Sequence, residues 1–325
     1  MEQIKGNAGQ IEAARDKAGQ DVSTQVDAVQ IEAVQRMQDY LRIHASGEKF
    51  DWEGFWKAAC YSRRHAGRIF RELTGYTPGQ YLRRVQLTQS AEELAKESST
   101  ILETALSTGF DSHEGFTRAF SRMFGVAPRE YRREKMAIPF FTQYPVRNYY
   151  LYITGKEREK MEKSMTTCTV IPVERCSRKL IFQRSRSATD YWTYCEELNC
   201  DWEGLFNSIP QKFDTAAILE LPDFLHKAGF SRVAAGVEVP MDYCARLPEN
   251  CELAELPPCT LLYFQSEPFE REEEFCAAIE AAFRAVERYE PGRYGFEWAP
   301  DTAPSFNFGA SAAEGARLAY PVRKK

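Results

Sequence analysis

The spacing of apolar residues changes along the chain and divides it into regions. From residue 31 onward, apolar side chains recur every three or four positions, which is the period of one face of an α-helix. The first such helix ends before Gly47, and a long helix is expected from Thr77 to about Glu97. Residues 1–30 are instead polar and rich in Gln, Gly and Ala, so we expect a disordered or loosely helical extension there.

An internal repeat with an offset of 50 residues overlaps the helical region. Chance does not place so many identities at one offset within so short a stretch, so the region holds two copies of one unit. The matched pairs are Glu53/Glu103, Ser62/Ser112, Arg68/Arg118, Phe70/Phe120, Gly75/Gly125, Pro78/Pro128, Tyr81/Tyr131 and Arg83/Arg133.

Each copy carries the start and stop signals of a short helix, a tight turn and a longer helix. Ser62 is expected to cap the longer helix of the first copy; in the second copy Asp111 or Ser112 does so, and Asp111 with Glu114 predicts a capping box. Glycine then ends each longer helix in a left-handed conformation. This is the plan of a helix-turn-helix, and two of them on one rigid connector can reach successive major grooves, about 34 Å apart.

The exposed faces of the two longer helices supply the candidate base contacts, whereas Arg83, Arg84, Arg122, Arg132 and Arg133 are expected to contact phosphate and set the register. Arginine can read guanine through two hydrogen bonds or grip phosphate, and glutamate can accept from cytosine. A solvated charged face is the ordinary alternative, but both copies place arginine at the same position. The candidates are Arg63, Arg64, Arg68, Arg83, Arg84, His113, Glu114, Thr117, Arg118, Arg122 and Arg132.

Two stretches, YSRRHAGRIFRELTGYTPGQYLRR and STGFDSHEGFTRAFSRMFGVAPREYRR, resemble the DNA-binding signature of the AraC/XylS transcription regulators. The resemblance implies a seven-helix DNA-binding domain over residues 31–137 and double-stranded DNA as the partner. It also implies contacts from the positions of Arg64, Arg68, His113, Glu114 and Arg118. Gly67 departs from the family pattern, where a longer side chain is frequent.

Beyond a linker placed at residues 138–167, the pattern becomes one of short alternating strands. Residues 168–325 predict two β-β-α-β-β units, with helices over 191–206 and 270–289. Strands are expected near 169–173, 180–184, 216–221, 232–239, 253–256, 261–265, 294–298 and 317–322. The fold class is therefore multi-domain, an all-α tandem helix-turn-helix domain followed by an α+β domain.

The C-terminal region resembles the gyrase-inhibitor-like domains that bind small molecules. The resemblance rests on the duplicated plan, on the sequence GFEW at 295–298 and on a last strand ending AYPVRKK. The resemblance implies a small hydrophobic or amphiphilic effector bound between the halves, with Glu297 as a pocket acid. Relatives place an acid about four residues before the last proline, where this chain has Arg317. The candidate ligand residues are Tyr191, Trp192, Trp202, Tyr263, Glu297, Trp298, Phe306 and Arg317.

Arg317 leaves three alternatives open. It pairs with Glu297 and gives a neutral pocket, it stays free to meet an anionic effector, or it is a solvated surface residue. The first two alternatives favour neutral or anionic amphiphiles over lipophilic cations.

Net charge is informative about DNA binding only when it is counted separately for each region of the chain. The whole chain carries −5, whereas residues 31–137 hold 17 Lys and Arg against 14 Asp and Glu. Nine cysteines without a C-x-x-C pair, no secretory signal and no long apolar run predict reduced thiols in a cytoplasmic protein.

Three classes of function compete. A ligand-responsive transcription regulator without enzymatic activity, metal or cofactor is the leading hypothesis. A C-terminal hydrolase fused to a DNA-binding domain is the alternative, with Glu297 as its one candidate acid, because no Ser-His-Asp order or metal-ligand spacing is visible. The third is an interaction module that acts on RNA polymerase or gyrase.

Overall fold

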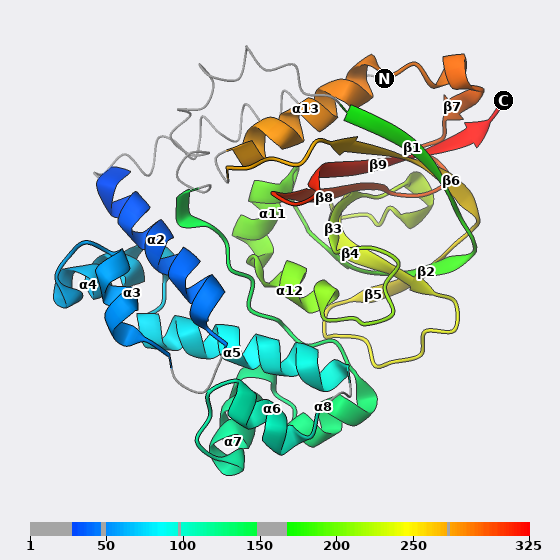
Figure 1. The fold of residues 1–325 in the computed structure, drawn as a ribbon. Helices are drawn as coiled ribbons and strands as arrows, with labels where there is room; N and C mark the ends of the chain where they lie inside the picture. The colour runs from blue at the N-terminus through cyan, green and yellow to red at the C-terminus, as the bar shows by residue number, and fades with distance from the viewer. Residues whose placement is uncertain (1–27, 47–49, 97–98, 148–167, 272–273) are drawn as a thin grey trace. The chain divides into compact units, whose positions relative to one another are not determined.

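The computed structural model describes residues 28–46, 50–96, 99–147, 168–271 and 274–325, which form two compact units (Figure 1). The expected extension at 1–30 lies outside the described residues except for its last three, which begin the first helix. In the described ranges no helix is long and apolar enough to cross a membrane.

The first unit is helical, and its elements follow the predicted repeat. The two copies hold the pairs α3–α4 and α6–α7, and α5 joins them. Its helices are α2 (Ala28–His44), α3 (Trp52–Ala58), α4 (Arg63–Thr74), α5 (Pro78–Ala95), α6 (Ile101–Ser107), α7 (His113–Phe124) and α8 (Pro128–Glu134). The described residues between 28 and 134 thus form seven helices, the number that the resemblance implies.

Helix α5 belongs to two hydrophobic cores, which explains why it is apolar on more than one side. Its first half buries Tyr81 and Val85 in a core with α2, α3 and α4. Its second half buries Leu87 and Leu94 in a core with α6, α7 and α8. Each copy of the repeat therefore has its own core, and one continuous helix fixes the two copies relative to each other.

Residues 138–147, expected to begin the linker, pack onto this helical unit. Gln38, which is 6% exposed, donates from Nε2 to Tyr144 O (3.0 Å) and accepts from Val146 N at Oε1 (2.9 Å). Arg147 makes a two-pronged ion pair with Glu32, with N···O distances of 2.7 and 2.5 Å. The remainder of the expected linker, 148–167, lies outside the described residues.

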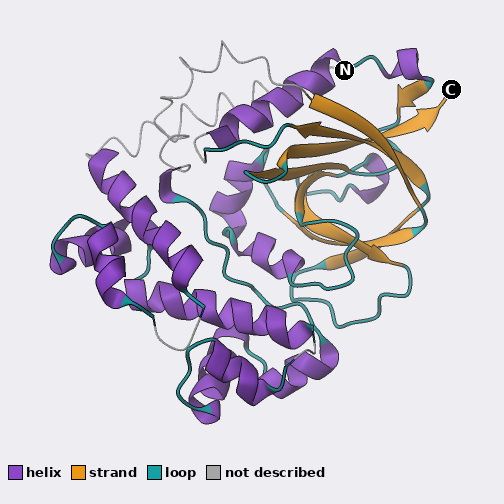
Figure 2. Ribbon diagram, in the orientation of Figure 1, coloured by secondary structure: helices purple, strands orange, loops and turns teal. Residues whose placement is uncertain are grey.

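The second unit is a curved antiparallel sheet with its α-helices on the outer face, while the short 3-10 helix η1 (Asp223–Leu225) packs on the other side through Leu225 (Figure 2). Its strand order is β1-β6-β9-β8-β3-β4-β2-β5, and β7 pairs with β9. The strands are β1 (Cys168–Arg175), β2 (Arg178–Arg184), β3 (Ala217–Glu220), β4 (Val233–Pro240), β5 (Glu252–Leu256), β6 (Cys259–Ser266), β7 (Phe296–Trp298), β8 (Ser305–Ser311) and β9 (Gly315–Lys324). The helices are α11 (Tyr191–Leu198), α12 (Asp201–Asn207) and α13 (Phe275–Arg288).

Strand alternation gives the sheet two differently packed faces. On β6 and β9, Leu262 and Leu318 pack against α13, whereas Leu261, Tyr263 and Ala319 belong to a cluster on the other face. That second cluster also holds Leu180, Leu219 and Phe306, and we call the face that carries it the inner face.

The sequence patterns were wrong in three places. The expected helix over 191–206 is two helices, because Asn199 adopts a left-handed φ of 65° between them. Strand β8 was missed, since Gly309 interrupts the alternation that marks a strand. The Asp111–Glu114 capping box does not form; Ser112 caps α7 instead, and its Oγ accepts from Gly115 N (3.1 Å).

Candidate nucleic-acid interface and effector site

Helix α4 is held by its caps and its buried face, so its arginines face outward. Ser62 Oγ accepts from His65 N (3.4 Å), and Gly75 ends the helix at φ 77°. Ala66, Ile69 and Phe70 are buried in the first core. The remaining face exposes Arg63, Arg64, Arg68 and Arg71.

Helix α7 repeats this arrangement on the second core. It also has twelve residues, begins after a serine cap and ends at a left-handed glycine, Gly125. Phe116, Phe120 and Phe124 are buried. The exposed face carries His113, Glu114, Arg118 and Arg122, and Thr117 is half-buried beside them.

A matching pair of buried aromatic residues anchors each of the helices α4 and α7. Phe70 of α4 meets Tyr81 of α5 edge to face, with ring centroids 5.3 Å apart. The matching pair Phe120 and Tyr131, from α7 and α8, lies at 5.8 Å. Because both contacts are buried, they fix the rotation of each helix about its axis. The arginines at the matched positions 68 and 118 therefore leave their helices in corresponding directions.

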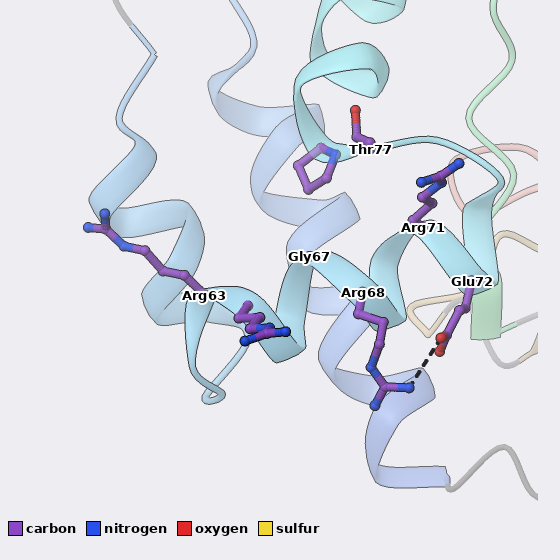
Figure 3. A pocket seen from close by; sticks show the side chains of 8 residues that line it. Arg63, Gly67, Arg68, Arg71, Glu72 and Thr77 are labelled. Atoms are coloured by element: carbon purple, nitrogen blue, oxygen red, sulfur yellow. Dashed lines mark hydrogen bonds and ion pairs between the residues drawn. The ribbon is translucent and has the colours of Figure 1, made fainter.

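An open hollow of about 710 Å³ lies along the exposed face of α4 and the start of α5 (Figure 3). Figure 3 shows Arg63 and Arg68 projecting away from the helix body, while Arg71 turns toward Thr77. Arg68 Nη1 lies 3.1 Å from Glu72 Oε1, and both side chains are more than half exposed. The residues lining the hollow are Arg63, Arg64, Gly67, Arg68, Arg71, Glu72, Thr77 and Pro78.

The other predicted DNA-contact arginines are held differently. Arg83 stacks over the Phe110 ring (4.2 Å to the centroid), and Arg84 over the Tyr76 ring (4.5 Å). Such stacking orders a guanidinium before any ligand arrives. Arg132 is half-buried on α8. Arg71 was missed by sequence reasoning, although its place three residues after Arg68 puts it on the same face.

The predicted ligand residues do not meet at one place. Tyr263, Phe306 and Arg317 lie on the inner face or contact its cluster. Trp298 instead packs on the α13 side, with its ring 6.3 Å from that of Phe264. Glu297, whose side chain is 53% exposed on β7, lies 3.5 Å from Arg323 and is not the partner of Arg317.

A third aromatic group stands at α11 and α12. The Tyr191 ring lies 5.0 Å from Trp192 and 6.2 Å from Trp202, and Trp202 is 5% exposed. Burial raises the pKa of the Tyr191 phenol, so it stays protonated at neutral pH. The eight predicted residues therefore fall into three groups.

A charged cluster on the inner face was missed by the sequence reading. Arg178, fully buried, donates from Nε to Glu238 Oε1 (2.5 Å), and Arg175 Nε lies 3.4 Å from Glu238 Oε2. Burial raises the pKa of Glu238 despite the opposing effect of Arg178. The only sequence signal was polar residues at inward-facing strand positions, and alternation alone does not say which partners they meet.

Arg317 completes this cluster. Its Nη2 donates to Asp214 Oδ1 (2.6 Å) and to Thr215 Oγ1 (3.0 Å). Arg175 Nη2 donates to the Tyr263 hydroxyl (2.6 Å), which donates to Asp214 Oδ2 (3.2 Å). Burial raises the pKa of Tyr263, so the phenol keeps the proton that it donates.

Comparison with known proteins identifies the helical unit. A family model described as a helix-turn-helix domain matches residues 56–134. The chain is 44% identical over 78 residues to the transposon Tn10 TetD protein of Escherichia coli, and the match covers 24% of this chain and 56% of TetD. Thus the chain spans about half the length of that relative.

A second relative is covered more fully. The multiple antibiotic resistance protein MarA of Escherichia coli strain K12 is 35% identical over 89 residues, which are 27% of this chain and 70% of MarA. A solved structure of a probable AraC family transcriptional regulator from Rhodopseudomonas palustris is 26% identical, with 31% of this chain and 94% of that chain covered and a TM-score of 0.29. With the helix-turn-helix match and the similarity to MarA, the chain belongs to the AraC family of DNA-binding transcription regulators.

Proposed function

We propose that the chain regulates transcription by placing α4 and α7 in successive major grooves of duplex DNA, and that residues 168–325 sense a small hydrophobic or amphiphilic molecule. The observation that carries the first part is the equivalence of Arg68 and Arg118. Both are exposed at the same position of two helices that are seated by matching aromatic contacts.

The arginines divide into two roles. Arg64, Arg68 and Arg118 lie on the exposed faces of α4 and α7, where extended guanidinium groups can reach base edges. Arg83 and Arg84 are already stacked on aromatic rings and suit phosphate contacts that set the register. In this scheme the Thr117 side chain packs against the bottom of the DNA major groove. Gly67 is at the matching position of the first copy, so no side chain fills the groove there.

Selection from randomised duplexes tests this function with the full chain. We expect a site with two unlike half-sites, centred about one helical turn apart, because two rigidly joined helices enter adjacent grooves. Arg68→Ala should relax base preference in one half-site and Arg118→Ala in the other. Arg42→Ala, which changes an exposed arginine on α2, is the matched control.

Two results would contradict the DNA part of the proposal. One is a selected motif that both variants leave unchanged. The other is a preference for single-stranded over duplex DNA, because the spacing of α4 and α7 is proposed to fit successive major grooves, which only a duplex has.

The sensing part is supported by the chemistry of the inner face. Aromatic and aliphatic side chains surround partly exposed arginines there, a combination that suits a molecule with an apolar body and a polar group. Sensing requires that the ligand bind one functional state more tightly than another, typically by about 1–3 kcal/mol. DNA affinity measured with and without a bound ligand is therefore the readout.

Bound at a promoter, such a chain would act on RNA polymerase.

A further inference from the structure

The charged cluster of the inner face holds more positive than negative charge. Its cations are Arg175, Arg178 and Arg317, and its anions are Asp214 and Glu238. Arg178 and Glu238 are nearly inaccessible, whereas the side chains of Arg175 and Arg317 are 16% and 20% exposed. An excess positive charge in a partly buried place is costly unless a counter-ion compensates it.

Arg317 also has an unused donor. Among the residues that the structure describes, Nε of Arg317 is buried and has no hydrogen-bond acceptor, whereas Nε of Arg175 lies 3.4 Å from Glu238 Oε2. Buried guanidinium donors are normally satisfied, so Nε of Arg317 indicates where a missing acceptor would bind. Both arginines reach Asp214, one through each carboxylate oxygen, which places their head groups side by side.

Aromatic rings flank the same place. The Arg317 guanidinium lies 4.7 Å from the centre of the Phe308 ring, and that of Arg175 lies 5.7 Å from Phe213. Phe308 stacks on Tyr263 and on Phe306, at 5.8 and 5.6 Å. An anionic group bound between the arginines would therefore have apolar surface beside it for the rest of its molecule.

We propose that Arg175 and Arg317 form the anion-binding part of the effector site and that the effector is a monoanionic amphiphile, with a carboxylate on an apolar body. The proposal rests on the sensing function proposed above. A carboxylate carries one negative charge, which balances the excess, whereas a phosphate monoester would carry nearly two at neutral pH. A cation would face the same two arginines and be repelled.

Calorimetric titration of the full chain with four probes of equal chain length tests the proposal. The probes are n-decanoate, n-decanol, decyl phosphate and decyltrimethylammonium, each kept below its micelle concentration. We expect decanoate to bind at least ten-fold more tightly than decanol, decyl phosphate less tightly than decanoate, and the cation most weakly.

Variants assign this preference to the arginines. Arg317→Gln should lower decanoate affinity by ten-fold or more and leave decanol affinity within two-fold. Arg317→Lys keeps the positive charge but loses the paired N–H donors of the guanidinium. Its decanoate affinity should lie between those of the unmodified chain and Arg317→Gln. Arg323→Gln, on the same strand β9 but paired with Asp301 and Glu297, is the matched control and should bind as the unmodified chain does. Melting temperatures show whether each variant is folded.

The outcomes separate this inference from the sensing function. Equal or tighter binding of the cation, decanoate affinity unaffected by Arg317→Gln in a folded variant, or no binding of any anion would overturn the inference. If decanol or the cation then changes DNA affinity, sensing stands without an anion site. If decanoate binds through Arg317 but leaves DNA affinity unchanged, the anion site stands and sensing through it fails.

Discussion

Arg68 and Glu72 form an exposed ion pair on the outer face of α4, with Nη1 and Oε1 3.1 Å apart. At the position of Glu72 in the second copy, 50 residues later, the chain has Arg122. The first helix thus carries a carboxylate where the second carries a cation, beside the arginine that we assign to base contact. The two copies are alike in packing but unlike in the charge they present to DNA.

Removing that carboxylate should strengthen DNA binding. Glu72→Gln removes the negative charge that pairs with Arg68, which keeps its contact with His65 Nδ1 (3.2 Å). Since exposed pairs of this kind are worth about 0.2–1 kcal/mol, we expect affinity to rise between about 1.4-fold and about five-fold at low salt, and less at high salt. Fluorescence anisotropy with a labelled duplex measures it. Glu53→Gln breaks a comparable exposed pair with Lys57 on α3 and should change little; a weaker complex for Glu72→Gln would refute this role.

Helix α4 should tolerate a side chain at Gly67. A Cβ there would lie 3.7 Å from Trp56 Cη2, which is ordinary van der Waals contact. Gly67→Ala should therefore stabilise the helical unit by about 0.5–1 kcal/mol, because glycine loses more backbone entropy on folding. Urea denaturation measures the change. Gly54→Ala, whose Cβ would collide with Tyr40 Oη, is the contrasting variant and should destabilise.

The two matched tyrosines should respond differently to loss of their hydroxyls. Tyr81 Oη accepts from Gln38 Nε2 (3.1 Å) in a buried place. Within the described residues, Tyr131 Oη is buried without a hydrogen-bond partner. Tyr81→Phe should cost about 1 kcal/mol, whereas Tyr131→Phe should be neutral or slightly stabilising. Equal losses of unfolding free energy for the two variants would show that both hydroxyls are satisfied.

The buried ion pair of the inner face should make a pH-dependent contribution. Arg178→Met leaves the Glu238 carboxylate buried without its nearest cation, and we expect a loss of about 3–5 kcal/mol at neutral pH. The pKa of Glu238 is already raised by burial, and it should rise further without Arg178. As pH falls and the group binds its proton, the loss should shrink. A deficit that stays constant between neutral and acidic pH would contradict this account.

Local signals explain which parts of the fold could be predicted. Ser62, Gly75 and Pro78 act within one turn of their own positions, and their recurrence 50 residues later predicted both helix-turn-helix units. The second unit was less predictable because its sheet order depends on pairings between distant strands. Strand β8 was missed, as its glycine interrupts the alternation.

The proposed effector site was still harder to predict from the sequence, for the same reason. Arg317 was singled out by position, but its partner Asp214 lies in a loop with no pattern of its own. Arg175 and Tyr263 lie on the paired strands β1 and β6 but are four positions apart in register, so their contact also depends on the reach of two long side chains. A sequence can predict that a residue faces inward, but it cannot state which charges meet there when several strands separate them.

The affinity of the full chain for its selected duplex, compared with a scrambled duplex of equal length, tests the central claim most directly. We expect Arg68→Ala and Arg118→Ala each to weaken binding to the selected duplex by about 1–3 kcal/mol and to change binding to the scrambled one little. Binding to both duplexes should fall steeply as salt rises. Equal losses on the two duplexes would show that these arginines contact only phosphate, and would contradict the proposal that α4 and α7 read bases.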